Sequence, residues 1–310
     1  MISQLPKGIM MVRPYGFGAN PETAPSNTFQ EAVSGTSEDV AIKARREFDL
    51  LIQKLESHNI PVYVFEEEEG MFTPDAVFPN NWISFHPDGT VVIYPMESAS
   101  RRKERRFDIL DQLQSSYNFE ITRVIDLSCY ERNGYYLEST GSLIFDYPNQ
   151  TAYVCRSSRS SEQIIAHLAQ LLGLKIVLFD SFDKQGLPIY HTNVMMCLAE
   201  KFAVLCLESI PEGPEKEVLL ESLKRSKREL VDLTLAQVYA FAGNMYQLKN
   251  RQGQKYLLMS DTAYQSMDPR QIEQIESHCA ILSSPIPTIQ KYGGGSIRCM
   301  MAGVMLPAAL

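Results

Sequence analysis

The sequence predicts an α/β fold in which five similar units, each of two or three strands and one helix, close on themselves. Short strand-like runs alternate with amphipathic helices along the 310 residues, and no low-complexity linker interrupts them. Helices are expected to begin near residues 40, 100, 160, 214 and 268, at intervals of 60, 60, 54 and 54 residues. Regular spacing of this kind is typical of a radial repeat. A plain βα sandwich is the alternative that the same alternation allows.

The strands are predicted from short apolar runs that turn residues bound. Pro87-Asp88-Gly89 is a strong turn signal between two such runs, so residues 82–85 and 90–94 are expected to form a hairpin. The acidic run 66–69 is expected to be a solvated loop, because adjacent like charges repel. The other expected strands cover residues 9–12, 61–65, 122–125, 141–145, 152–154, 176–179, 194–198, 203–207, 256–259 and 280–282.

The helices are predicted from apolar residues at intervals of three and four. Phe48, Leu51 and Leu55 share one face of a helix over 40–55. Ser160 or Ser161 is expected to cap the next clear helix, and Gly173 to end it. The remaining expected helices begin near residue 100, with five basic residues in 101–106, and cover 214–227 and 268–278.

Composition and charge exclude several classes of protein. Lys and Arg number 29 and Asp and Glu number 37, so the net charge of −8 argues against nucleic-acid binding. No apolar run approaches the roughly 20 residues that span a bilayer. The N-terminus does not resemble a secretory signal. A single catalytic domain over residues 1–310, in the cytoplasm, is therefore expected.

The six cysteines form no CxxC pair and are expected to be reduced thiols, most of them small buried hydrophobes. They are Cys129, Cys155, Cys197, Cys206, Cys279 and Cys299.

Four polar segments place reactive side chains at the edges of strands. They are FTPDAVFPNNW around Asp75, YLESTGSL around Glu138, YHTNVMM around His191 and GGGSIRCMM around Cys299. Each has an ordinary structural explanation: a capping acid, a core histidine, a flexible glycine turn or a cysteine that fills the core. Together they offer a thiol, a base that can activate it, and acids that can orient the base or hold a substrate rich in N–H groups. A metal site is the rival interpretation, but no second histidine stands at ligand spacing from His191.

The order of these segments resembles that of the guanidino-group modifying superfamily, which includes arginine deiminases, dimethylarginine hydrolases and amidinotransferases. The strings FPNNWISFH, HTNVMM, FAGNMYQL and SIRCM most resemble the citrulline-utilization hydrolase branch. The resemblance covers nearly the whole chain. It implies the pentein fold, a five-bladed β/α propeller with pseudo-fivefold repeats.

The resemblance also implies roles for individual residues. Cys299 is the expected nucleophile, His191 the general acid and base, and Glu138 the residue that orients His191. Asp75 is expected to bind the N–H groups of the substrate head. Arg159 resembles an arginine that holds the substrate carboxylate, and Arg102 is a second candidate for that role. Asn244 is a candidate for positioning either backbone or substrate.

One departure from the family pattern bears on the substrate. Arginine deiminases carry a second aspartate two residues after the histidine, where this chain has Asn193. A cationic guanidinium would need two buried carboxylates to balance it, whereas a neutral ureido group suits one carboxylate and an amide that both donates and accepts. Asn193 is therefore a candidate substrate-binding residue. Dimethylarginine hydrolases also lack that aspartate.

The sequence thus predicts a cysteine-dependent hydrolase of a ureido or guanidino group, with citrulline as the favoured substrate and ornithine, carbon dioxide and ammonia as products. No cofactor and no metal are expected, and the partner is a small amino acid. A deiminase or hydrolase of arginine or methylarginine, an amidinotransferase and a non-catalytic amino-acid binding protein remain as alternatives. The sequence leaves a homo-oligomer open.

Overall fold

Fifteen strands form five three-stranded sheets of one common design in the part of the chain that the computed structural model describes, residues 2–25, 27, 29–31, 37–67, 70–71 and 73–309. In every sheet the middle strand pairs antiparallel with one neighbour and parallel with the other. The five sheets, antiparallel neighbour first, are β15(Ala302–Val304)-β1(Gly8–Arg13)-β2(Val62–Glu66), β3(Ile83–Phe85)-β4(Thr90–Ile93)-β5(Arg123–Asp126), β6(Ile144–Asp146)-β7(Thr151–Cys155)-β8(Lys175–Phe179), β9(Met196–Leu198)-β10(Phe202–Leu205)-β11(Glu229–Asp232) and β12(Tyr246–Lys249)-β13(Lys255–Ser260)-β14(Ala280–Ser284).

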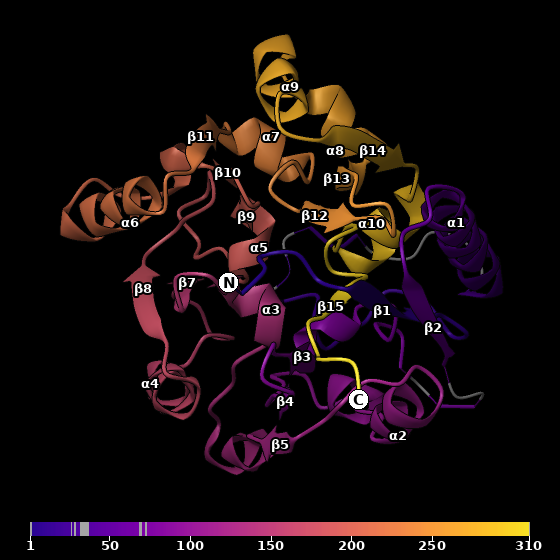
Figure 1. Ribbon diagram of the computed structural model, residues 1–310. Helices are drawn as coiled ribbons and strands as arrows, with labels where there is room; N and C mark the ends of the chain where they lie inside the picture. The colour runs from indigo at the N-terminus through magenta and orange to yellow at the C-terminus, as the bar shows by residue number, and fades with distance from the viewer. Residues whose placement is uncertain are drawn as a thin grey trace.

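The sheets are arranged around the middle of the molecule, with the parallel outer strands β2, β5, β8, β11 and β14 toward the periphery (Figure 1). The first sheet contains both ends of the chain, because β15 pairs with β1 through Ile9 and Gly303. The C-terminal strand therefore joins the first and last segments of the fold.

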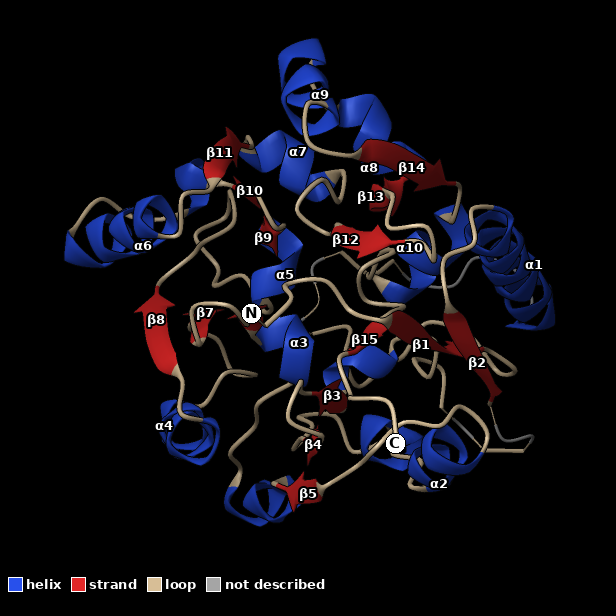
Figure 2. Ribbon diagram, viewed as in Figure 1, coloured by secondary structure: helices blue, strands red, loops and turns tan. Residues whose placement is uncertain are grey.

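Helices occupy two kinds of connection, and Figure 2 shows the longer ones at the outside. One kind joins a middle strand to its parallel outer strand, as a parallel pair requires; these helices are α1(Ser37–Ser57), η2(Arg101–Glu104) with α2(Asp108–Ser115), α4(Glu162–Leu172), η4(Leu207–Ser209) with α6(Pro214–Arg225), and α8(Asp261–Ser266) with α9(Pro269–Glu276). The other kind leads from one sheet to the next; these helices are η1(Pro79–Asn81), η3(Ser128–Asn133), α3(Ser139–Ser142), α5(Thr192–Met195), α7(Leu235–Tyr239) and α10(Pro287–Gly293).

The predicted helices are present, and Ser161 stands at the N-cap position of α4, although its side chain makes no capping hydrogen bond. Gly173 ends α4 in the left-handed conformation at φ +65°. Pro214 and Pro269 open α6 and α9. The helix expected near residue 100 is divided, because a 3₁₀ turn over 101–104 precedes α2 at Asp108.

Two predicted strands are shorter than expected. The runs 141–145 and 194–198 both include part of a single helical turn, α3 or α5, before β6 and β9 begin. Both turns are fully buried, so their apolar residues do not distinguish a turn from a strand. These turns carry the polar residues described below.

His86 makes the stability of the fold dependent on pH. It lies buried beyond β3, contacts Phe145 and Tyr147, and shares a 2.8 Å hydrogen bond with Ser84 Oγ. Burial lowers its pKa from 6.5 to about 4. Between pH 6.5 and about 4, His86 is therefore protonated in the unfolded chain but neutral in the folded chain. The free energy of unfolding decreases as the pH falls through this range.

We expect His86 to contribute about 2–3 kcal/mol to the difference in unfolding free energy between pH 7 and pH 4.5. Guanidinium titrations at both pH values, on the wild type and on H86Q, measure this contribution. Carboxylates and His191 titrate in both proteins, so the difference between them isolates His86. Equal pH dependence in the two proteins would contradict the assignment.

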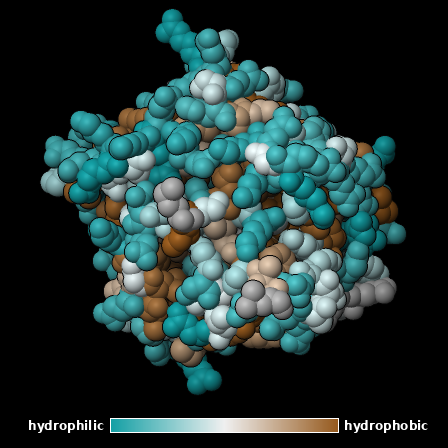
Figure 3. Space-filling view, in the orientation of Figure 1, coloured by the Kyte–Doolittle hydropathy of each residue, from teal (hydrophilic) through white to brown (hydrophobic). Residues whose placement is uncertain are grey.

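Within the described ranges, no helix combines the length and the apolar character that crossing a bilayer requires. The face seen in Figure 3 is mostly hydrophilic, with apolar side chains in scattered patches.

Candidate active site

The segments that lead into the inner strands of the sheets bring polar residues together in one cavity. Asn81 precedes β3, His191 precedes β9 and Cys299 precedes β15. The cavity is lined by Thr23, Asn27, Asp75, Phe78, Asn81, Arg101, Arg159, Tyr190, His191, Gly293, Gly294, Gly295 and Cys299. Its volume is about 20 Å³.

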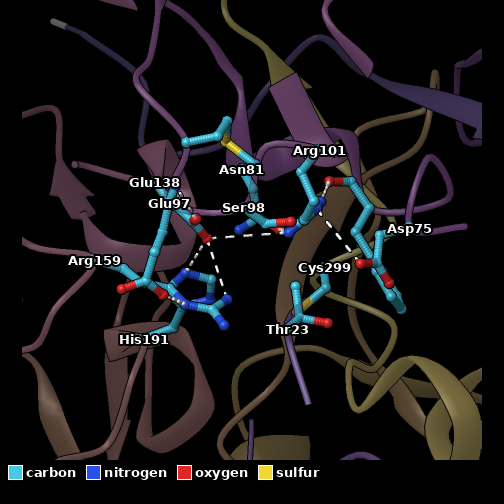
Figure 4. A network of polar contacts seen from close by, with 12 residues as sticks. Thr23, Asp75, Asn81, Glu97, Ser98, Arg101, Glu138, Arg159, His191 and Cys299 are labelled. Carbon is cyan, nitrogen blue, oxygen red and sulfur yellow. Dashed lines mark hydrogen bonds and ion pairs between the residues drawn. The ribbon is translucent and has the colours of Figure 1, made fainter. Parts of the chain in front are cut away.

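His191 and Glu138 form the centre of the polar network shown in Figure 4. Each stands directly before a buried helical turn, His191 before α5 and Glu138 before α3. His191 Nε2 donates to Glu138 Oε2 at 2.8 Å, which leaves Nδ1 as the ring nitrogen that can exchange a proton. Burial lowers the pKa of His191, and the Glu138 carboxylate opposes that shift. The resting imidazole is therefore neutral near pH 7.

Cations keep the Glu138 carboxylate ionised although it is fully buried. Burial alone would raise its pKa, but Arg159, the His191 hydrogen bond and Arg101 together hold the pKa of Glu138 well below its usual range. Arg159 Nη1 lies 3.3 Å and Arg101 Nη1 lies 4.0 Å from Glu138 Oε2. The Glu97 backbone N–H donates to Oε1 at 3.1 Å. The carboxylate is thus a fixed negative charge beside His191.

Arg159 is buried beside the histidine, not on the surface. Its Nε lies 3.0 Å from Glu97 Oε2, and its guanidinium lies 4.9 Å from the Tyr190 ring centroid. Tyr190 packs against the His191 ring at 4.7 Å and donates its hydroxyl to the Gly294 carbonyl. Arg159 therefore lines the cavity in a fixed position, and its contact with a substrate stays a prediction.

Two asparagine amides donate to the sulfur of Cys299. Asn244 Nδ2 lies 3.2 Å and Asn193 Nδ2 lies 3.6 Å from Sγ. Asn244 also accepts the Arg298 backbone N–H and donates to the Asn193 carbonyl, so it links the two segments. The structure therefore places Asn193 beside the sulfur.

The glycine-rich segment is an ordered helix end, not a flexible turn. Gly294 adopts φ +61° after α10, and a Cβ there would lie 2.5 Å from Asn27 Nδ2. A Cβ at Gly295 would lie 2.9 Å from the Phe78 ring. The absence of side chains lets Asn27 and Phe78 pack directly against the segment that ends at Cys299.

Asp75 lies on the side of the cavity opposite His191 (Figure 4). Its Oδ2 accepts from Asn20 Nδ2 at 2.7 Å and lies 3.8 Å from Arg101 Nε. Burial raises the pKa of Asp75, and Arg101 and Asn20 oppose that shift. Phe72, at the start of the predicted motif, lies outside the described residues.

The structure brings Arg101, and not Arg102, to the cavity. Arg101 forms a bidentate pair with Glu104 and donates to Asn81 Oδ1 at 2.9 Å. Arg102 points away and donates to the carbonyls of Met96 and Glu97. The run of basic residues does not show which arginine faces the cavity. The rotation of the short 3₁₀ turn over 101–104 determines which of its side chains is buried.

Asn81 is a cavity residue that sequence reasoning did not single out. It is buried, its Oδ1 is held by Arg101, and its Nδ2 has no hydrogen-bond partner among the described residues. A Cβ at Gly141 would lie 2.3 Å from Asn81 Nδ2 and 2.9 Å from His191 Nδ1. Gly141 therefore permits the amide and the imidazole to pack closely. The FPNNW string, which contains Asn81, was the sequence feature that could have identified it.

No group of three or more His, Cys, Asp or Glu side chains that could hold a metal occurs among the described residues.

Comparisons with known proteins agree with this fold. The family model described as N,N dimethylarginine dimethylhydrolase, eukaryotic, matches residues 13–306. No similar sequence was found among proteins with curated functions.

Three solved structures illustrate the structural similarity. The first is apo ArgZ, an arginine dihydrolase from the ornithine-ammonia cycle in cyanobacteria, with 16% sequence identity and a TM-score of 0.71. The match covers 97% of this chain but only 41% of the length of ArgZ. The N-terminal domain of an ArgZ variant, covalently bound to a reaction intermediate, has 15% identity and a TM-score of 0.70, with 96% of this chain and 99% of that domain covered.

The third is a variant of dimethylarginine dimethylaminohydrolase that forms an adduct with S-methyl-L-thiocitrulline, at 14% identity and a TM-score of 0.63, with coverage of 96% and 99%. Identities this low show a shared mixed α/β fold, and the family match over most of the chain carries the assignment. The chain therefore belongs to the N,N-dimethylarginine dimethylhydrolase family, hydrolytic enzymes of the guanidino-group modifying pentein superfamily.

Proposed function

We propose that this chain is a cysteine hydrolase that converts citrulline and water to ornithine, carbon dioxide and ammonia. In this proposal Cys299 is the nucleophile, His191 the acid and base, and Glu138 the residue that orients His191. Asp75 and Asn193 hold the ureido group, and Arg159 binds the substrate carboxylate.

The charge balance of the cavity is the observation that carries the choice of substrate. Asp75 is the one carboxylate among the described lining residues, and Arg101 lies within 3.8 Å of it. Glu138 lies behind the cavity wall, bound to His191 and near Arg159. An incoming guanidinium would thus meet a carboxylate that already has a cation nearby, although Arg101 also pairs with Glu104. A neutral ureido group brings no such charge into a buried site.

The first half of the reaction forms a covalent intermediate. Cys299 passes its proton to neutral His191 as Sγ attacks the ureido carbon, and Asn193 and Asn244 direct amide N–H groups toward the sulfur. The new C–S bond replaces the bond to the terminal nitrogen, which leaves as ammonia with the proton from His191. Glu138 stabilises the imidazolium that exists between these transfers. The product is an S-carbamoyl thioester that still carries the ornithine nitrogen.

The second half releases the product. His191 takes a proton from water as the oxygen attacks the carbonyl carbon, and the proton then returns to the sulfur as the C–S bond breaks. The released carbamate loses carbon dioxide and leaves ornithine. Acid–base assistance of this kind is typically worth about 10²–10⁴-fold. No step requires a cofactor.

Arginine is the second candidate substrate. The family model is that of a dimethylarginine hydrolase, and ArgZ is an arginine dihydrolase, so guanidino compounds are processed by proteins of this fold. The same residues would release ammonia from arginine in the first step. A deiminase would stop at citrulline, and an amidinotransferase would pass the group to an amine instead of water.

The N193D variant tests the charge argument. A carboxylate next to Cys299 would favour a cationic substrate and disfavour the thiolate, so we expect both substrates to react more slowly. The ratio of kcat/KM for arginine to that for citrulline should nevertheless rise about tenfold or more, since one buried charge pair is worth over 1.4 kcal/mol. Steady-state kinetics on both substrates measure the ratio. An unchanged ratio would remove Asn193 from substrate selection.

We also propose that the five sheets are the blades of a five-bladed propeller and that the whole chain is a single catalytic domain. The common strand order of the five sheets and the pairing of β15 with β1 support this arrangement.

A further inference from the structure

A second cavity lies where the antiparallel inner strands of all five sheets meet. Each inner strand contributes to its wall: Ser84 of β3, Phe145 of β6, Cys197 of β9, Tyr246 of β12 and Gly303 of β15. Its volume is about 40 Å³, enough for one or a few heavy atoms. None of its described lining residues also lines the cavity beside Cys299.

Arg298 gives this central cavity a positive charge. Its side chain is 7% exposed, and its guanidinium carbon lies 4.0 Å from the Tyr246 ring centroid. Among the described residues, no carboxylate lies within ion-pair distance of Arg298, whereas the similarly buried Arg101, Arg159 and Arg228 each pair with at least one carboxylate. Of its five N–H groups, one has an acceptor in the described chain, the Met301 carbonyl. A buried cation with so few acceptors is costly unless something else supplies them.

The neighbouring side chains do not supply the missing negative charge. Burial raises the pKa of Cys197 to about 12 and raises those of Tyr147 and Tyr246, so these groups stay neutral near pH 7. Gln4 is occupied as well: its amide donates to the Phe145 carbonyl and accepts the Tyr147 backbone N–H. Gly303 permits Tyr246 to sit against Arg298, because a Cβ there would lie 1.9 Å from the Tyr246 hydroxyl.

We propose that the central cavity binds a small monovalent inorganic anion, a halide or bicarbonate, held by the free edge of the Arg298 guanidinium. An anion of that size fits the volume and supplies both the charge and the hydrogen-bond acceptors. The site is separate from the reaction cavity, so the proposal does not depend on the substrate assignment.

Bromide diffraction tests the site directly. Crystals of the full chain soaked in sodium bromide should show an anomalous peak in the central cavity beside Arg298. No such peak should appear there in R298M crystals, and R270M, which removes an exposed arginine of α9, should keep it. The proposal would be overturned if wild-type crystals showed no such peak and bicarbonate did not raise the Tm of the wild-type protein. This outcome does not depend on whether R298M folds.

Thermal unfolding distinguishes the anions in solution. At constant ionic strength, replacing gluconate, which is too large for the cavity, with chloride or bicarbonate should raise the Tm of the wild type and R270M. A rise of about 2–4 °C is expected at an anion concentration tenfold above Kd. The anion that produces the rise identifies the ligand. An equal rise in R298M would show that the effect arises elsewhere and would contradict the proposal.

Discussion

Replacing Cys299 with alanine is expected to abolish turnover of L-citrulline, with a loss in kcat/KM of at least about 10⁴-fold. The proposed reaction passes through a bond to Sγ, and the amides of Asn193 and Asn244 that face this sulfur cannot replace it. The variant should remain folded, since alanine fits the space of cysteine. Ornithine release and the circular dichroism spectrum of C299A measure the two expectations.

The matched control is C206A, which changes a buried cysteine directly after β10. It should keep nearly full activity, because Cys206 lies in a hydrophobic cluster and not in the reaction cavity. Turnover by C299A within tenfold of the wild type would exclude Cys299 as the nucleophile.

Replacing Glu138 with glutamine should lower kcat by about 10²–10⁴-fold and change the pH profile. Glutamine can still accept the hydrogen bond from His191 Nε2, but it cannot stabilise the imidazolium. The Glu138 carboxylate raises the pKa of His191 against the effect of burial, so its removal should lower that pKa further. The acid limb of kcat/KM, which we expect below pH 6.5 in the wild type, should therefore move to lower pH in E138Q.

The pH shift separates a positioning role from a merely structural one, because misfolding would lower the rate at every pH. E131Q is the control, since Glu131 pairs with Arg105 away from the cavity. An acid limb that stays in place, together with a rate within tenfold of the wild type, would contradict the assigned role of Glu138.

The parts of the fold that the sequence could predict are those with a strong local signal. Gly173, Pro214 and the Pro87-Asp88-Gly89 turn set element boundaries through backbone conformation alone, and these boundaries appear in the structure. The strands β11, β12 and β15 were not predicted. β15 has the sequence AGV, and its place in the first sheet is determined by pairing with β1 at the other end of the chain.

The site divides in the same way. Cys299, His191 and Glu138 stand in distinctive motifs, and the structure brings them to the same region. Arg101 and Asn81 depend on packing: the first is selected over Arg102 by the phase of a short turn, and the second by the absence of a side chain at Gly141. Arg159 was a candidate only through its resemblance to an arginine that holds a substrate carboxylate, and the sequence around it does not show that it is buried. Its burial depends on Glu97 and Glu138, which are 62 and 21 residues away in the sequence.

The most direct measurement of the proposed function is ornithine and ammonia release from L-citrulline by the wild-type chain, with L-arginine assayed in parallel and C299A as the blank. We predict one ornithine and one ammonia per citrulline consumed, with arginine consumed much more slowly. Citrulline accumulating from arginine, with no ornithine formed from added citrulline, would contradict the ureido hydrolase assignment and would make the chain an arginine deiminase.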